Sequence, residues 1–388
     1  MRKVRRVYFD NASTTELDPE VRQTYEKILD TYYVNSESLY DEGMQVHQMM
    51  EKARHALADL LGLKPQEIIY TSGSAEANTT AIKGICFAHP ENKHIVTTCV
   101  EHSSVLNACQ QMHDVFGYDV TYLPVYEDGR VKTEDVKKAV REDTALVSIM
   151  YVNNETGAIN PIHDIASYIK KETHAYFHVD MTQAVGKVPL DLENIDAASL
   201  SAHKFNGLKG SGILVKKSYV DLLPLINGGE QEQGLRGGTA NSPADIVFAK
   251  TLRLALERGK KYHSYVASLK DRLLAGLKQI EGIEINSPAD GIVSTINFSY
   301  EPIPSEVMQN ALNEKGFMVS ARSTCDSRSG NPSYVLRAMG FDEKRANSCI
   351  RVSLSEKNTP EEIDAFLTAL KDIIAKYSLA DIHIWTMP

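Results

Sequence analysis

Between residues 65 and 217, short apolar runs alternate with amphipathic stretches, and this alternation restricts the fold more than any other feature. The apolar runs cover 67–71, 94–98, 119–123, 145–152 and 175–180, with helical patterns at 103–116, 133–141 and 161–173. Strands that alternate with helices predict a mostly parallel sheet with right-handed crossovers. The runs at 145–152 and 175–180 are nearly continuous in apolar residues, which predicts strands covered by helices on both faces.

A different pattern follows Pro243. A helical stretch spans 244–280, and further patterns are a strand at 294–300, a helix near 305–315 and strands at 318–322 and 349–355. These elements are typical of a smaller α+β unit. We therefore expect a large domain over 12–255 and a small domain formed by 1–11 and 256–388.

The last helix has a clear start signal. Thr359 is a good N-cap, Pro360 suits the first helical position, and Glu362 completes a capping box.

The bulk composition excludes several classes of function. With a net charge of −9 and 42 basic residues, the chain has no wide basic surface for direct nucleic-acid binding. The N-terminal "MRKVRR" lacks the apolar region of a secretory signal, and no stretch reaches the ~20 apolar residues of a membrane span. We expect a soluble, cytoplasmic protein without a membrane partner.

The cysteine pattern argues against a disulfide framework and against a zinc site. The five cysteines are widely spaced and contain no CxxC pair: Cys86, Cys99, Cys109, Cys325 and Cys349. All but Cys325 lie in apolar or periodic surroundings, so we expect them to act as small buried hydrophobic residues. We expect no metal.

Polar side chains follow the predicted strands where each strand ends. They include the turn at Ser74, His102, Asp180 and Lys204. Each has an ordinary alternative, because aspartate often forms turns and a lysine before glycines is usually solvated. The carboxyl ends of parallel strands share one edge, where ligands bind. A lysine for a Schiff base, an acid for a pyridine nitrogen and an anion-binding turn together favour pyridoxal 5′-phosphate.

The sequence also resembles a known family. The blocks that carry the resemblance, in order, are "YFDNASTTELDP", "EIIYTSGSAEANTTAIKG", "VEHSSVL", "VSIMYVNNETG", "FHVDMTQAVGKVPLDL", "SLSAHKFNGLKGSG", "GLRGGT" and "PSYVLRAMG…IRVSLS". They are similar to cysteine desulfurases of the group with the longer catalytic loop, in the class V aminotransferase superfamily. The resemblance implies the fold of fold-type I pyridoxal-phosphate enzymes.

The resemblance implies a role for each cofactor-binding residue. Lys204 would form the Schiff base and move protons, Asp180 would pair with the pyridinium nitrogen, and Gln183 would bind the phenolic oxygen. His102 would stack on the ring and act as acid and base for the substrate thiol. The phosphate would be held by Ser74, Ala75, Ser201 and His203, and by Thr239 from the second subunit of a homodimer with shared active sites.

The substrate side follows from the same resemblance. Asn154 would touch cofactor and substrate, and Arg351 would clamp the substrate carboxylate. Cys325 lies in a polar segment, "SARSTCDSRSG", that offers no apolar packing, although an inert exposed thiol is the plain alternative. We expect Cys325 to become the persulfide and to pass sulfur to an acceptor protein.

The chain departs from the family pattern near the expected substrate site. The segment "NSESLY", which ends in Tyr40, lacks the proline, serine and histidine of the family pattern. Ala75 replaces a threonine and has no hydroxyl, and Thr79 replaces an asparagine. Leu208 replaces a proline, and Arg322 replaces a glycine. Three functions remain open: a desulfurase that converts L-cysteine to L-alanine, a pyridoxal-phosphate enzyme for selenocysteine, cysteine sulfinate or another small amino acid, and a pyridoxal-binding scaffold with weak activity.

Overall fold

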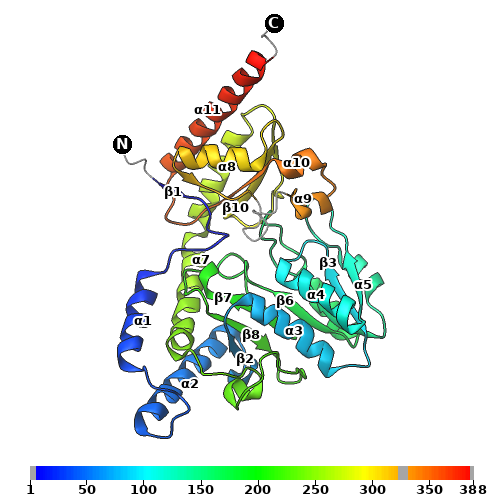
Figure 1. Ribbon diagram of the computed structural model, residues 1–388, viewed down its shortest axis with the longest axis vertical. Helices are drawn as coiled ribbons and strands as arrows, with labels where there is room; N and C mark the ends of the chain where they lie inside the picture. The colour runs from blue at the N-terminus through cyan, green and yellow to red at the C-terminus, as the bar shows by residue number, and fades with distance from the viewer. Residues whose placement is uncertain (1–5, 322–330, 385–388) are drawn as a thin grey trace.

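The computed structural model describes residues 6–321 and 331–384 (Figure 1). Its largest sheet has seven strands in the order β2-β8-β7-β6-β5-β3-β4. The strands are β2 (Ile68–Thr71), β3 (His94–Thr98), β4 (Asp119–Leu123), β5 (Thr144–Ser148), β6 (Tyr176–Asp180), β7 (Ala197–Ser201) and β8 (Gly212–Lys216). Only β8 runs against its neighbours. The predicted mostly parallel sheet is therefore confirmed.

Helices cover both faces of this sheet. In the described part of the chain they are α2 (Asp41–Leu61), α3 (Ser74–Ala88), α4 (Ser103–Phe116), α5 (Thr133–Ala139), α6 (Ile162–Glu172) and the long α7 (Ser242–Leu277), while α1 (Pro19–Thr31) packs against α7. Short 3-10 turns are η1 (Pro65–Glu67), η2 (Ala202–Lys204) and η3 (Gln231–Gly234). Helices α3 and α4 lie on one face, whereas α2, α5, α6 and α7 supply the core of the other. The layers follow from the apolar strands, which must bury both sides.

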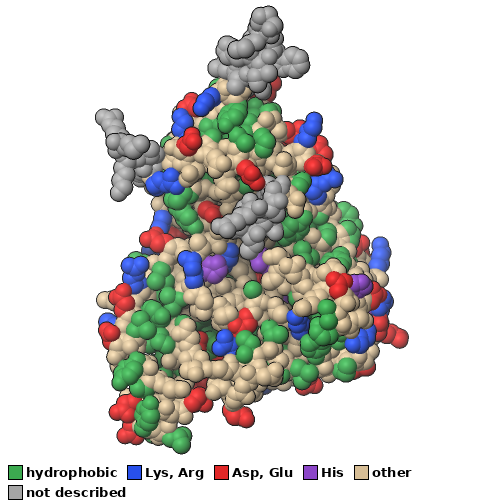
Figure 2. Space-filling view, in the orientation of Figure 1, with side chains coloured by type: hydrophobic (Ala, Val, Ile, Leu, Met, Phe, Trp, Pro, Cys, Tyr) green, Lys and Arg blue, Asp and Glu red, His purple; other side chains and the backbone are tan. Residues whose placement is uncertain are grey.

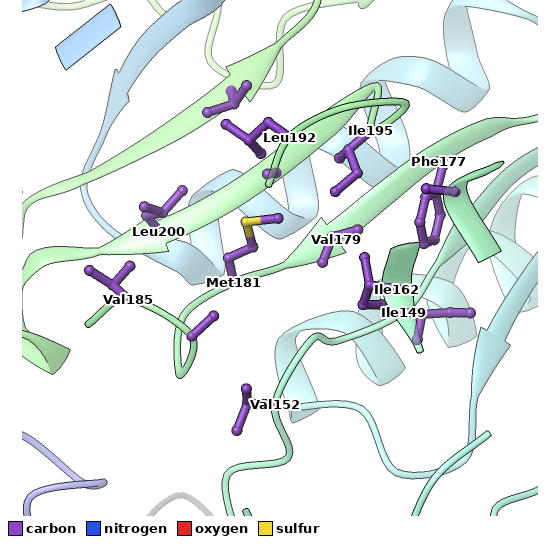
Figure 3. Packing of buried hydrophobic residues seen from close by; sticks show 14 of the residues in the cluster. Ile149, Val152, Ile162, Phe177, Val179, Met181, Val185, Leu192, Ile195 and Leu200 are labelled. Atoms are coloured by element: carbon purple, nitrogen blue, oxygen red, sulfur yellow. The ribbon is translucent and has the colours of Figure 1, made fainter. Parts of the chain in front are cut away.

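Alternate residues of each strand enter the two cores. In β2, Ile69 joins the cluster under α3 and α4, while Tyr70 joins the opposite cluster. Figure 3 shows part of that opposite cluster, which includes Phe177 and Val179 of β6 and Leu200 of β7. Because side chains alternate with a period of two, the register of each strand is fixed by both cores.

The upper part of Figure 1 is a separate α+β layer. It contains a three-stranded sheet in the order β12-β10-β9 and the parallel pair β1-β11. Its elements are β1 (Val7–Tyr8), β9 (Ile283–Ile285), β10 (Thr295–Tyr300), α8 (Ser305–Glu314), β11 (Phe317–Met318), α9 (Tyr334–Ala338), α10 (Glu343–Asn347), β12 (Cys349–Ser353) and α11 (Pro360–Ile384).

Helix α7 connects the two parts of the molecule. Ala255 belongs to the core beneath the large sheet, and Val266 belongs to the core of the upper layer, which also includes Val7 and Phe9. This change lies close to the expected boundary between residues 255 and 256. The domain limits themselves stay a prediction.

Two sequence predictions differ instructively from the structure. The strand expected over 145–152 ends at Ser148, because the N–H of Met150 donates instead to the Glu101 carboxylate, at 3.0 Å. The strand expected over 318–322 shrinks to Phe317–Met318, followed by a single bridge between Ser320 and Arg351. Side-chain and tertiary contacts override the local pattern in both places.

Local signals elsewhere predicted the structure well. The capping box at Thr359 is confirmed, since the Glu362 N–H donates to its hydroxyl at 3.3 Å and its own N–H donates to the Glu362 carboxylate at 3.3 Å. Cys86, Cys109 and Cys349 are buried as expected, whereas Cys99 is partly exposed. Within the described ranges, none of the helices has the length and apolar character required to cross a bilayer.

Candidate active site

Ten of the twelve residues expected in the site line one hollow at the carboxyl edge of the large sheet. They are Ser74, Ala75, His102, Asn154, Asp180, Gln183, Ser201, His203, Lys204 and Arg351. Figure 2 shows histidine and basic side chains gathered at the waist between the two parts of the molecule. Thr239 lies instead in an adjoining hollow that shares Ser72 and Gly210 with the first. Cys325 lies outside the described residues.

One end of the hollow is suited to an anion. Helix α3 begins at Ser74, so backbone N–H groups of its first turn point into the hollow. Gly73 caps the helix with φ of 150°, and a Cβ on Gly212 would lie 2.6 Å from its Cα. This close approach requires glycine and brings β8 and Ser201 against the turn. His203 contributes a ring whose Nδ1 lies 3.0 Å from the Thr14 hydroxyl.

The acid of the site is held by two donors. The Thr182 N–H donates to Asp180 Oδ1 at 2.9 Å, and Asn78 Nδ2 donates to Asp180 Oδ2 at 2.9 Å. Asp180 is 5% exposed and Asn78 is fully buried. Hydrogen bonds of this kind stabilise a carboxylate that burial would otherwise disfavour.

Asn78 also links the acid to His102. Its amide donates to Ser104 Oγ at 3.0 Å, and Ser104 Oγ lies 2.8 Å from His102 Nδ1. The backbone N–H of Ser104 donates to the same Nδ1 at 3.1 Å. Because an N–H can only donate, Nδ1 is an acceptor, and in the neutral ring the proton lies on Nε2.

The lysine of the site contacts the N-terminal segment. Lys204 Nζ donates to the carbonyls of Ala12 and Ser13, at 2.8 and 2.7 Å. Gln183 Nε2 donates to the same Ala12 carbonyl at 2.8 Å. The amine and the amide therefore converge on one point of the hollow, even though 20 residues separate them in sequence.

The opposite end of the hollow holds Arg351. This side chain is 1% exposed; it donates to the Asn154 carbonyl at 2.8 Å and to Asp10 Oδ1 at 3.1 Å. Ser320 also donates to Asp10 Oδ1, at 2.8 Å. Arg351 Nε and Asn154 Oδ1 are buried without a hydrogen-bond partner among the described residues. Such atoms indicate that this end is built to receive a polar ligand.

Two buried titratable groups lie behind the site. Burial lowers the pKa of His178 to about 4, although Asp180 opposes this shift, and the neutral ring lies 2.8 Å from both Ser148 Oγ and Ser199 Oγ. Burial also raises the pKa of Glu101 to about 8, against hydrogen bonds from Met150 and Thr98. His178 links the neighbouring strands β5, β6 and β7, and Glu101 directly precedes His102.

Sequence reasoning missed four residues that hold the site together: Asp10, Asn78, Ser104 and Lys187. All four occur inside the motifs quoted above, but only three-dimensional contacts show what they touch. The departure at Thr79 has a local explanation, since its hydroxyl donates to the Ala75 carbonyl within α3 at 2.8 Å. Tyr40 precedes α2 as its N-cap residue and is half exposed.

The donor set fits a cofactor with a phosphate, a pyridine nitrogen and an aldehyde. The helix N-terminus with Ser201 and His203 suits the phosphate, the Asp180 carboxylate suits the ring nitrogen, and Lys204 is the amine between them. Fold and site together therefore define an α/β enzyme with a lysine–aspartate cofactor site.

Comparison with known proteins identifies the family. The model of the aminotransferase class-V family matches residues 7–366. A NifS/IcsS protein homolog of Lactobacillus delbrueckii subsp. bulgaricus is 40% identical, over 96% of this chain and 98% of its own. A protein of Methanosarcina thermophila named cysteine desulfurase IscS is 38% identical, over 95% and 92%. A solved NifS-like protein superimposes with a TM-score of 0.89 at 37% identity, over 95% and 99%. The chain belongs to the aminotransferase class-V family, which implies pyridoxal phosphate, and is a homologue of the cysteine desulfurases.

Proposed function

We propose that this enzyme is a pyridoxal 5′-phosphate-dependent cysteine desulfurase, which converts L-cysteine to L-alanine and leaves the sulfur as a persulfide on Cys325. The observation that carries this proposal is the convergence of Lys204, Asp180, His102 and Arg351 on one hollow. Relatives named cysteine desulfurase, similar over nearly the whole chain, support the choice of substrate.

The bound cofactor would supply an electron sink for bonds at the substrate α-carbon. Lys204 would take and return protons near that carbon, Asp180 would keep the ring nitrogen protonated, and Gln183 would donate to the phenolic oxygen. The N-terminus of α3, Ser201 and His203 would hold the phosphate. Positioning by fixed side chains accounts for a large part of such rate accelerations.

The substrate is bound from the opposite end. Arg351 donates to its carboxylate with the nitrogen that has no partner in the described structure, and Asn154 presents its amide beside it. His102 lines the hollow with Nε2–H, so in its neutral form the ring is a hydrogen-bond donor toward the substrate.

The sulfur step balances without an external oxidant. The Cys325 thiolate attacks the substrate sulfur, and an S–S bond forms as the carbon–sulfur bond breaks. The electron pair stays on the carbon fragment, which takes up a proton and leaves as alanine. The persulfide sulfur then passes to a thiol of an acceptor protein.

The enzyme acts as a homodimer in this proposal, and Thr239 completes the phosphate site of the second subunit. Thr239 lies outside the hollow of its own chain. Large apolar side chains are also exposed on this monomer, including Leu39 at 90% and Tyr33 at 81%. A second copy would bury such a surface. We place the enzyme in the cytoplasm, where sulfur-acceptor proteins would be its partners.

Replacement of the proposed nucleophile tests the function. Cys325→Ser should bind L-cysteine and change the cofactor spectrum as the wild type does, yet form almost no alanine, with a loss of ~10³-fold or more. Mass spectrometry after brief exposure to L-cysteine should find one added sulfur atom on the Cys325 peptide. The buried Cys109 provides an internal control and should carry none. Near-full turnover by Cys325→Ser on selenocysteine or cysteine sulfinate would instead favour the alternative substrates.

A further inference from the structure

A second hollow lies behind Lys204, between the turn after β6, helix α7 and the ends of β10 and β12. Lys204 lines both hollows, and on this side a second lysine, Lys187, accompanies it. No step of the proposed reaction uses Lys187. A lysine half-buried beside the reactive lysine is costly, because both ammonium groups favour water and repel each other.

Lys187 makes one short contact. Its Nζ donates to Gln183 Oε1 at 2.6 Å, while Gln183 Nε2 donates to the Ala12 carbonyl at 2.8 Å. An ammonium or amine group is a donor here, and a carbonyl can only accept. Rotating the Gln183 amide by half a turn would place its NH2 group against Lys187 and its oxygen against the carbonyl. The two contacts together therefore hold the amide in one orientation.

The backbone keeps Lys187 in place. Gly186 adopts φ of 71°, and a Cβ there would lie 2.8 Å from the Ala255 carbonyl oxygen on α7. A Cβ on Gly259 would come within 2.1 Å of the Gly186 carbonyl oxygen. The turn thus lies directly against the α7 backbone, and Lys187 folds back to a residue four positions earlier.

The surroundings of Lys187 are mostly basic. Burial, together with Lys204 and Arg351, lowers its pKa to about 7. Other charged or titratable groups of the second hollow are Arg258, Tyr262, His263 and Glu356. Arg258 forms an ion pair with Glu356 at 3.1 Å, so the Glu356 carboxylate already has a cationic partner other than Lys187.

We propose that Lys187 is a positioning residue that holds the Gln183 amide with its NH2 group toward the cofactor's phenolic oxygen. This inference rests on the proposed cofactor and deepens the role of that site. An amide N–H donor at the phenolic oxygen disfavours the protonated form of the cofactor's linkage to Lys204. Lys187 therefore lowers the pH at which the bound cofactor changes its visible absorption.

The test compares Lys187→Met and Lys187→Arg as holoenzymes without substrate. Lys187→Met removes the donor to Gln183 Oε1, and the midpoint of the visible-band pH titration should rise by about half a unit or more. Lys187→Arg keeps a donor at this position and should restore most of the wild-type midpoint. In assays with L-cysteine, Lys187→Met should lower kcat more than it changes KM, because the residue does not touch the substrate.

A matched control separates this role from the general loss of a lysine removed from solvent. Lys270 is buried and donates to the Ile292 carbonyl at 2.9 Å, away from the cofactor hollow. Lys270→Met should lower thermal stability and leave the titration midpoint unchanged. Circular dichroism of each variant checks that the fold is retained.

A double-mutant cycle decides whether Lys187 acts through the amide. In a Gln183→Ala background, Lys187→Met should produce less than half of its usual midpoint shift. An equal shift in both backgrounds, or no shift in either, would overturn the proposal. If the wild type shows no pyridoxal absorption at all, the proposed function fails instead, and the two failures are thus distinguishable.

Discussion

The two ends of the active-site hollow are built differently. The cofactor end is built at the ends of two adjacent strands of one sheet, with Asp180 closing β6 and Lys204 in the turn after β7, and Asn78 and backbone groups hold these side chains. The substrate end is assembled from three separate segments: Arg351 on β12, Asp10 after β1 and Asn154 after β5. Here two buried polar atoms lack a partner in the described structure.

This difference shows that the two ends of the hollow depend on different parts of the fold. The register of a single sheet, fixed by two cores, aligns the strand ends that carry Asp180 and Ser201, and the Ala12 carbonyl then holds Lys204 and Gln183. The substrate end depends on how the upper layer packs against the large sheet, since Arg351 and Asn154 meet only across that contact. We expect variants at the first end to damage the chemistry and variants at the second to weaken substrate binding.

Lys204→Ala should show the largest effect. Removal of the amine that moves protons should lower kcat by ~10³-fold or more, and borohydride should no longer fix the cofactor to the chain. Lys209→Ala is a matched control, because Lys209 lines the same hollow but is exposed. It should retain at least about a third of the activity. Substantial turnover by Lys204→Ala would break the assignment of the cofactor end.

Arg351→Lys should show the next largest effect, and on KM rather than kcat. Lysine keeps the positive charge but loses the planar fork, so KM for L-cysteine should rise ~10–100-fold. Arg345→Lys is a matched control in the upper layer, where Arg345 pairs with Glu284 at 3.1 Å. A fall in kcat at unchanged KM would contradict the division between the two ends.

Variants of Asn78 sharpen the description of the cofactor end. Asn78→Asp places a second carboxylate beside Asp180, which disfavours the charged acid and should lower kcat by ~10-fold or more. Ser104→Ala removes the hydroxyl that contacts His102 Nδ1 and keeps the hydrogen bond from the Ser104 N–H to the same atom. The decrease in kcat should therefore be smaller than in Asn78→Asp. Steady-state kinetics and the rate of cofactor release measure both. Equal effects would mean that the link to Asp180 is unimportant.

Much of the fold could be predicted from sequence because its signals are local. Strands 94–98 and 119–123 and helix 103–116 have the expected limits, since apolar periodicity and capping depend on neighbouring residues. The end of the strand at Ser148 could not be predicted, because the Glu101 side chain that accepts from the Met150 N–H lies 49 positions away from Met150.

The site shows the same limit. Residues at strand ends, such as Asp180 and Lys204, could be grouped because parallel strands share an edge. The supporting contacts could not, since Asn78 reaches Asp180 across 102 positions and Asp10 reaches Arg351 across 341. Periodicity carries no signal over such separations, and only the packing of the two cores brings these residues together.

The smallest expected effect concerns Glu101, behind His102 at the cofactor end. Burial raises the pKa of Glu101 to about 8 from 4.5. Between these values the folded protein holds a proton that the unfolded chain has released. The stability from this group is therefore complete below about pH 4.5 and is lost as pH rises through about 8.

Glu101→Gln removes this titration while it keeps the side-chain shape. The difference in Tm between the variant and the wild type should therefore change with pH and move in favour of the variant from pH ~5 to pH ~9, by about 2 °C or more. Thermal scans at one rate, with cofactor saturated, measure it. A constant difference across this range would mean that Glu101 is ionised in the folded protein. The cofactor end would then hold two buried carboxylates, Glu101 and Asp180, and its hydrogen bonds would have to stabilise both.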